Sequence, residues 1–130
     1  MAKADTGTAS TESGLDTAVI ERTAEWAGID EQDLCDALVV LHADLIGRHS
    51  QFERTFDYVT VDGTRAYRVS DAVCDELLSE FGFEGDIAAG VRLAHTEQAK
   101  LLFAKSVHGD DNFDADECGI VIGIDTAEQF

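Results

Sequence analysis

Four arginines have the clearest capacity for chemistry in this sequence: Arg48, Arg54, Arg65 and Arg68. A guanidinium donates a fork of N–H groups that matches two phosphate oxygens, so these residues form a candidate nucleic-acid-binding set. Residues 46–69 carry these four arginines against three acidic residues, in a chain of formal net charge −18. Surface arginines more often pair with neighbouring carboxylates, and the sequence leaves that alternative open.

The acidic segment 108–117 is a second candidate, because its spacing resembles a calcium loop. Oxygen-bearing side chains occupy alternate positions from 110 to 116, as the ligands of an EF-hand do. However, Ala115 stands where the bend needs glycine, and Val121 stands where a bidentate glutamate belongs. The pattern therefore predicts a solvated acidic loop and no calcium site.

Cysteine and histidine do not have metal-site spacing. Cys35, His42 and His49 recur every seven residues, which is about 10.5 Å along a helix and too far apart for one zinc ion. A core cysteine and partly buried histidines are the better interpretation. With Cys74 and Cys118 the cysteines are odd in number and form no C-x-x-C motif, so we expect reduced thiols in a cytosol.

Enzyme signatures are missing from the sequence. It contains no G-x-S-x-G nucleophile elbow, no G-x-x-x-x-G-K phosphate loop and no G-x-G-x-x-G dinucleotide motif. Paired carboxylates occur throughout an acidic chain, so no single pair stands out. We expect a protein that is not an enzyme and that holds no cofactor and no metal.

A β-hairpin at residues 57–69 would position two of the arginines. Asp62-Gly63 between two alternating segments favours a two-residue type I′ turn, because both central positions need positive φ. The turn fixes the register, with 61 opposite 64, 58 opposite 67 and 57 opposite 68. We expect an ion pair between Asp57 and Arg68.

The two faces of the hairpin differ. One carries Tyr58 and Tyr67 and should lie on the helices. The other carries Val59 and Ala66 and needs a cover, for which the apolar segment 120–124 is a candidate. The hairpin is then a brace for the core, a strand pair that joins two subunits, or a wing that touches nucleic acid.

Four main helices are expected around the hairpin. Their limits are about 15–27, 31–46, 70–81 and 86–107, with a short helix ending near 56. The helix 31–46 has the broadest apolar stripe and should lie at the centre of the fold. Trp26 and Leu101 are expected to point inward, and Ser50 with Glu53 to form a capping box.

These elements predict an α+β, mostly helical fold with one β-hairpin (57–69) and a C-terminal strand (119–124). Residues 1–13 read as a flexible tail and 14–130 as a single domain. No apolar run approaches the roughly 18 residues of a membrane span, and no secretion signal is recognisable. We therefore expect a cytoplasmic protein without membrane contact.

The acid excess is the strongest compositional signal, with 27 acidic against 9 basic residues. Because apolar content is normal and helix periodicity is clear, disorder is not the explanation. The composition resembles that of haloarchaeal cytosolic proteins, whose acidic surfaces stay hydrated in concentrated salt.

Residues 15–80 resemble a winged helix-turn-helix regulator. The similarity rests on two segments. The first is similar to the entry into a positioning helix and reads Gly28-Ile29-Asp30-Glu31-Gln32-Asp33-Leu34. In the second, the second hairpin strand leads directly into the next helix, at Ala66-Tyr67-Arg68-Val69-Ser70-Asp71. The sequence departs from the pattern before Gly47, where no turn separates a positioning helix from a recognition helix, and at the acidic hairpin tip.

Two functions follow from these observations. The first is a non-enzymatic regulator or protein-interaction module, expected as a homodimer because two broad apolar stripes exceed what a small core buries. The alternative, implied by the winged-helix resemblance, is a DNA-binding regulator that uses Arg48, Arg54, Arg65 and Arg68. An enzyme of unknown type is a third, weaker alternative.

Overall fold

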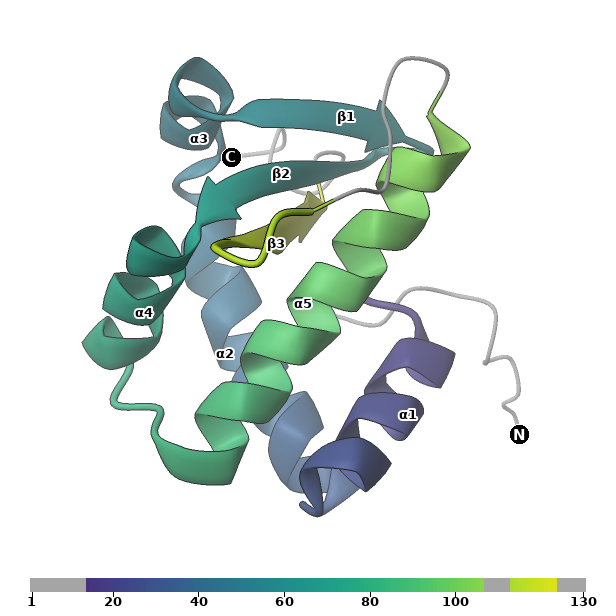
Figure 1. The fold of residues 1–130 in the computed structure, drawn as a ribbon, viewed down its shortest axis with the longest axis vertical. Helices are drawn as coiled ribbons and strands as arrows, with labels where there is room; N and C mark the ends of the chain where they lie inside the picture. The colour runs from purple at the N-terminus through teal and green to yellow at the C-terminus, as the bar shows by residue number, and fades with distance from the viewer. Residues whose placement is uncertain (1–13, 107–112, 124–130) are drawn as a thin grey trace.

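The computed structural model describes residues 14–106 and 113–123 and shows a mostly helical α+β domain (Figure 1). In chain order the elements are α1 (Thr17–Ala27), α2 (Glu31–Ile46), α3 (His49–Thr55), β1 (Asp57–Val61), β2 (Thr64–Ser70), α4 (Asp71–Glu80), α5 (Gly85–Lys105) and β3 (Glu117–Gly123). The predicted fold class is confirmed, including the hairpin and the C-terminal strand. The predicted tail at 1–13 lies outside the described residues.

The strands form one antiparallel sheet in the order β1–β2–β3. The hairpin register agrees with the prediction at every pair from 57–68 to 61–64. Asp62 and Gly63 have φ angles of 49° and 78°, so both central positions of the turn are left-handed, as a type I′ turn requires. β3 joins the other edge of β2, with Ile120 opposite Tyr67.

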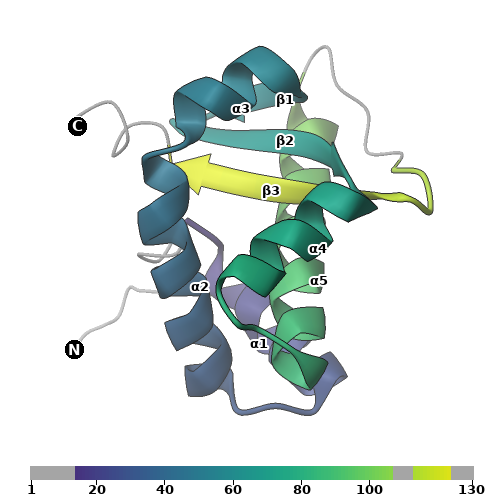
Figure 2. The ribbon, with the colours of Figure 1, turned by 90° about the vertical axis from the view of Figure 1, so that its left-hand side faces the viewer.

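Helices cover both faces of this sheet (Figures 1 and 2). α5 contacts all three strands and also packs against α1 and α2. On the opposite face α4 contacts β2 and β3, and α3 places Phe52 against Tyr67 with ring centroids 5.3 Å apart. The prediction that helix 31–46 is central is therefore wrong, because α5 joins more of the fold.

Small residues let α5 approach the sheet closely. Ala94 and Ala99 of α5 are fully buried. A Cβ on Gly119 of β3 would collide with Cβ of Ala99 and lie 3.2 Å from Cα of Thr96. Helix periodicity gives most weight to large apolar residues, so it did not identify this contact surface.

The second face of the hairpin is covered in a different way from the prediction. β3 extends the sheet beside β2 and does not lie across its face. α5 supplies the cover instead, so Val59 and Ala66 are 8% and 0% exposed. Tyr67 is buried as predicted, whereas Tyr58 at the sheet edge is 41% exposed.

Several helix ends follow their local signals. Asp30 accepts hydrogen bonds from two backbone N–H groups at the start of α2, and Ser70 accepts one at the start of α4. Gly28 ends α1 with a φ of 70°. These caps pair backbone groups that a helix end otherwise leaves free.

Three local predictions are wrong. Ser50 and Glu53 form no capping box, because α3 begins earlier, at His49, and its N-cap residue Arg48 makes no side-chain cap. Trp26 and Leu101 do not point into the core and are 65% and 40% exposed. Phe103, two residues after Leu101, is buried in its place.

A disulfide joins Cys74 of α4 to Cys118 of β3. The prediction of reduced thiols is thus wrong for these two residues, whereas Cys35 forms no disulfide with a described cysteine. Spacing gave no sign of the bond, since 44 residues separate the two cysteines. The β2–β3 pairing brings them together, because Cys118 lies opposite Val69 at the end of β2, where α4 begins.

Candidate functional site

Three of the four candidate arginines lie in carboxylate pairs. Arg48 lies between α2 and α4, with its Nε 2.5 Å from Asp44 Oδ2 and its Nη2 2.9 Å from Glu80 Oε1. Burial lowers the pKa of Arg48, but the hydrogen bond with Glu80 and the charge of Asp44 outweigh that effect, so the pKa lies above its ordinary value. This side chain acts as a clamp between two helices.

Arg65 is held on the aromatic face of the hairpin. Its Nη1 lies 2.5 Å from Glu53 Oε1, and its guanidinium carbon lies 4.3 Å from the centroid of the Tyr58 ring. Burial lowers the pKa of Arg65, and hydrogen bonds with Tyr67 and Glu53 raise it by more. The arginine therefore fixes α3 against the hairpin.

Arg68 lies on the other face of the sheet. Its guanidinium carbon lies 4.8 Å and 4.9 Å from the ring centroids of Phe103 and Phe113, and its Nε lies 3.9 Å from Glu117 Oε1. The predicted pair with Asp57 is wrong, because among the described residues the carboxylate partner is on β3. Arg68 connects α5, β2 and β3.

The structure does not gather the four arginines into one surface. Arg65 and Arg68 lie on opposite faces of β2, because strand residues alternate between faces. Arg48 lies between α2 and α4, while Arg54 is exposed in the last turn of α3. The predicted phosphate-binding set is therefore four separate positions.

A groove between α3 and α4 is an open surface that the sequence did not identify. Its volume is about 220 Å³. It is lined by Arg48, Gln51, Phe52, Phe56, Val73, Glu76, Leu77 and Glu80. Figure 2 shows α3 and α4 on the same side of the sheet, with α3 near its top edge and α4 lower, beside β3. The floor is apolar and the rim is charged, which is the usual composition of a surface that binds another chain.

Side chains from two helices cover the outer edge of β3, which no sequence motif indicated. The backbone N–H groups of Gly119, Val121 and Gly123 donate to Thr96 Oγ1, His95 Nδ1 and His42 Nε2, each at 3.0 Å. Strand edges normally leave such groups free to pair with another chain. The only available signal was a histidine on the apolar side of a predicted helix, which indicates burial but names no partner.

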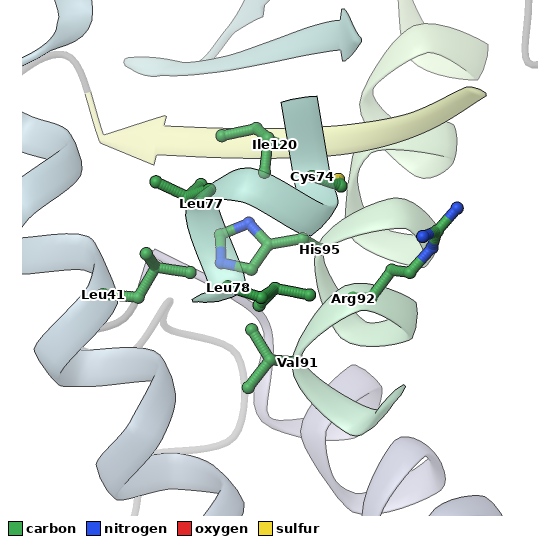
Figure 3. A pocket seen from close by; sticks show the side chains of 8 residues that line it. All are labelled: Leu41, Cys74, Leu77, Leu78, Val91, Arg92, His95 and Ile120. Carbon is green, nitrogen blue, oxygen red and sulfur yellow. The ribbon is translucent and has the colours of Figure 1, made fainter. Parts of the chain in front are cut away.

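His95 also faces a small buried cavity (Figure 3). The cavity has a volume of about 10 Å³ and is lined by Leu41, Cys74, Leu77, Leu78, Val91, Arg92, His95 and Ile120. Burial, followed by the charge of His42, lowers the pKa of His95 to about 3. The ring is therefore neutral near pH 7. Its Nδ1 accepts from Val121, so its Nε2 carries the proton and makes no hydrogen bond with any described residue.

The cavity does not fit a ligand larger than about one water molecule. In the described parts of the chain, no three histidine, cysteine or acidic side chains gather closely enough to hold a metal ion. The calcium-like segment 108–117 lies largely outside the described residues, which include only its last part, 113–117. A mostly polar depression of about 240 Å³ near Asp16 and Lys105 is also open, but the α3–α4 groove has the apolar floor and is therefore the candidate site.

Comparison with other proteins adds a family but no activity. Searches of curated proteins and of solved structures found no match to this chain. Residues 13–124, which span every helix and strand described above, match a family described as Domain of unknown function (DUF8048). The chain belongs to the family described as Domain of unknown function (DUF8048).

Proposed function

We propose that this protein is a non-enzymatic regulator that works by binding another protein, and that the groove between α3 and α4 is its binding surface. The observation that carries the proposal is the composition of the groove. Phe52, Phe56, Val73 and Leu77 contribute apolar surface to one depression. Apolar side chains gathered in this way are typical of sites that take up a helical or extended segment.

The rim indicates the charge of the partner. Glu76 and Glu80 border the groove, and both are exposed. Arg48, the cation at the rim, is already paired with Asp44 and Glu80. The partner segment should therefore combine apolar side chains with lysine or arginine.

Composition supports the proposed setting. The formal net charge of −18 favours the cytoplasm of a salt-adapted cell. In molar salt the Debye length is about 3 Å, so charge acts only between groups in near contact. Apolar contact in the groove should then supply most of the affinity, and the acidic rim should set the orientation of the partner. We also propose that the protein is a homodimer.

DNA binding is the alternative, and one observation favours it. Arg54 is exposed on α3, the short helix that precedes a true two-stranded hairpin. Against it, Arg48 and Arg65 each lie within 2.5 Å of a carboxylate oxygen, and phosphate would have to displace those partners. An electrostatic site is also weakened most by high salt. Protein binding therefore explains the surface better.

Selection of peptides on the intact chain tests the proposal. A displayed random library is panned in molar KCl, and binding of the selected peptides is measured by fluorescence anisotropy. Peptides with apolar residues at helical spacing and basic flanks are expected. Val73→Lys places a charge in the groove and should weaken binding about tenfold or more, since a buried apolar contact is lost.

Val40→Lys is the matched control, because Val40 is a 55% exposed valine on α2, outside the groove. It should leave affinity unchanged. Equal binding by the Val73→Lys and Val40→Lys proteins would refute the groove as the binding surface. A mixed-sequence duplex that binds the wild type in molar KCl, and fails to bind Arg54→Glu, would establish the DNA alternative instead.

A further inference from the structure

The two outer edges of the sheet differ in whether their outward backbone N–H groups are hydrogen-bonded. Side chains of α2 and α5 accept hydrogen bonds from the outward N–H groups of β3, so that edge cannot add another strand. β1 forms the opposite edge, along the top of the molecule in Figure 1. The availability of this second edge determines what the hairpin can bind.

The hairpin register shows which groups of β1 point outward. Val61 and Thr64 flank the two-residue turn and exchange hydrogen bonds, and in an antiparallel ladder such pairs alternate with non-bonded pairs. Val59 therefore also bonds to β2, while the backbone N–H and C=O groups of Tyr58 and Thr60 face away from the sheet. The same alternation gives β3 its outward N–H groups at 119, 121 and 123, which agrees with their observed partners.

The outward groups of β1 are open. Tyr58 is 41% exposed and Thr60 is also exposed. Among the described residues, no backbone or side-chain group bonds to the outward N–H groups of these two residues. β1 contains no lysine, no proline and no bulge, which are the usual protections of an edge strand. Its sequence D-Y-V-T-V instead favours pairing.

Charge makes a second copy of the chain a fitting partner for this edge. In molar salt only charges in near contact repel each other, so two copies of this acidic chain should meet where the local charge is nearly balanced. Residues 46–69, which include the hairpin, carry four arginines against three acids. The open edge thus lies in a stretch of nearly balanced charge.

The strand is also complementary to itself. In an antiparallel pair centred on Val59, Tyr58 of one copy lies opposite Thr60 of the other, and the two exchange hydrogen bonds on each side of the axis. Asp57 then lies opposite Val61, so no like charges meet. About four backbone hydrogen bonds would join the two sheets.

We propose that two copies of the chain pair through β1, antiparallel and centred on Val59, to form one continuous six-stranded sheet. The inference rests on the homodimer part of the proposed function and names its interface; it is independent of the groove. The hairpin is then neither a wing nor only a brace, because its outer strand joins two subunits.

Mixed cysteine variants test the register. Tyr58→Cys and Thr60→Cys are made separately in a Cys35→Ser background, with tags of different mass, then mixed and oxidised. The proposed pairing brings residue 58 of one copy opposite residue 60 of the other, so the mixture should give a crosslinked heterodimer. Each variant alone should crosslink far less, because residue 58 of one copy and residue 58 of the other are offset by two residues along the strand, as are the two copies of residue 60.

A second pair of variants tests the backbone bonds. Thr60→Pro removes an outward N–H at an edge position that tolerates proline, and should raise the dimer dissociation constant about tenfold or more. Thr60→Val loses the same hydroxyl but keeps the N–H, so its dimer should persist. Light scattering measures the oligomeric state, and circular dichroism confirms that both variants are folded.

The outcomes separate this inference from the function proposed above. A dimer that forms no 58–60 crosslink would overturn the β1 interface and leave the homodimer standing. A monomer at every concentration would overturn both, without bearing on binding in the groove. Equal crosslinking by Tyr58→Cys alone would contradict the register centred on Val59.

Discussion

Acid should destabilise this protein through His95 in a pH range that the structure defines. The pKa of the buried ring is lowered from 6.5 to about 3, first by burial and then by the charge of His42. A folded-state pKa below the unfolded value means that the unfolded chain binds the proton more readily. The contribution to stability is therefore complete above pH 6.5 and is lost as the pH falls from 6.5 towards 3.

The magnitude follows from the size of the shift. Each pH unit below 6.5 costs a little over 1 kcal/mol, so at about pH 4.5 the loss is roughly 2–3 kcal/mol. Protonation would also convert Nδ1 from an acceptor into a donor facing the Val121 N–H, 3.0 Å away. The seal at the edge of β3 should therefore weaken along with overall stability.

The assay is equilibrium unfolding in urea at about pH 7.5 and about pH 4.5, on either side of the unfolded-state pKa. Many carboxylates titrate in the same interval, so the wild type must be compared with His95→Asn. Asparagine has a side-chain oxygen that can replace Nδ1 as the acceptor for Val121, and it does not titrate. The wild type should lose about 2–3 kcal/mol more than His95→Asn between the two pH values.

Equal losses in the two proteins would refute the reasoning. That result would mean that the ring is already charged in the folded state or that its cavity admits water. An NMR titration gives an independent check, because the His95 ring resonances should stay in their neutral position down to about pH 4.5 in the folded protein. A midpoint near 6.5 would contradict the buried environment.

Two further predictions concern the contacts of β3. Reducing the Cys74–Cys118 disulfide should lower the free energy of unfolding by about 2–4 kcal/mol, because the bond closes a long loop of the unfolded chain. Urea unfolding with and without reductant measures the difference. An unchanged unfolding midpoint would show that the bond is not formed. Gly119→Ala should lower the free energy of unfolding by about 2 kcal/mol, since the added Cβ would collide with Ala99 and Thr96 of α5. Ala115→Gly, in the exposed turn before β3, should lower it far less.

The parts of the fold that the sequence predicts well depend on near neighbours. The register of the hairpin follows from Asp62-Gly63 alone, because a two-residue turn leaves one arrangement of the flanking strands. The caps at Asp30 and Ser70 involve residues within three positions of each helix start. Such interactions are determined by local sequence, and the structure confirms them.

The predictions that fail depend on partners far along the chain. His95 bonds to a strand 26 residues away, and His42 to one 81 residues away, and no spacing rule connects them. Ser50 has the sequence of a helix cap, but α3 begins at His49, directly after Arg48, which Asp44 and Glu80 hold. Long-range contacts of this kind overrode the local preference.

The candidate site shows the same division. The sequence identifies Arg48, Arg54, Arg65 and Arg68 by type, but whether each one faces a carboxylate or solvent depends on how the helices pack around the sheet. The α3–α4 groove combines side chains up to 32 positions apart, from Arg48 to Glu80, and no periodicity predicts such a surface. The distribution of charge along the sequence therefore points to residues 46–69, but it does not predict the groove.

Hydrogen-exchange mapping of a bound peptide tests the central claim most directly. A peptide selected on the intact chain in molar KCl is added to the wild type, and amide exchange is compared with and without it. Binding in the groove should slow exchange in α3 and α4, around Phe56 and Val73, and leave α1 unchanged. Protection confined to α1 or to the hairpin tip, with none in α3 and α4, would contradict the account.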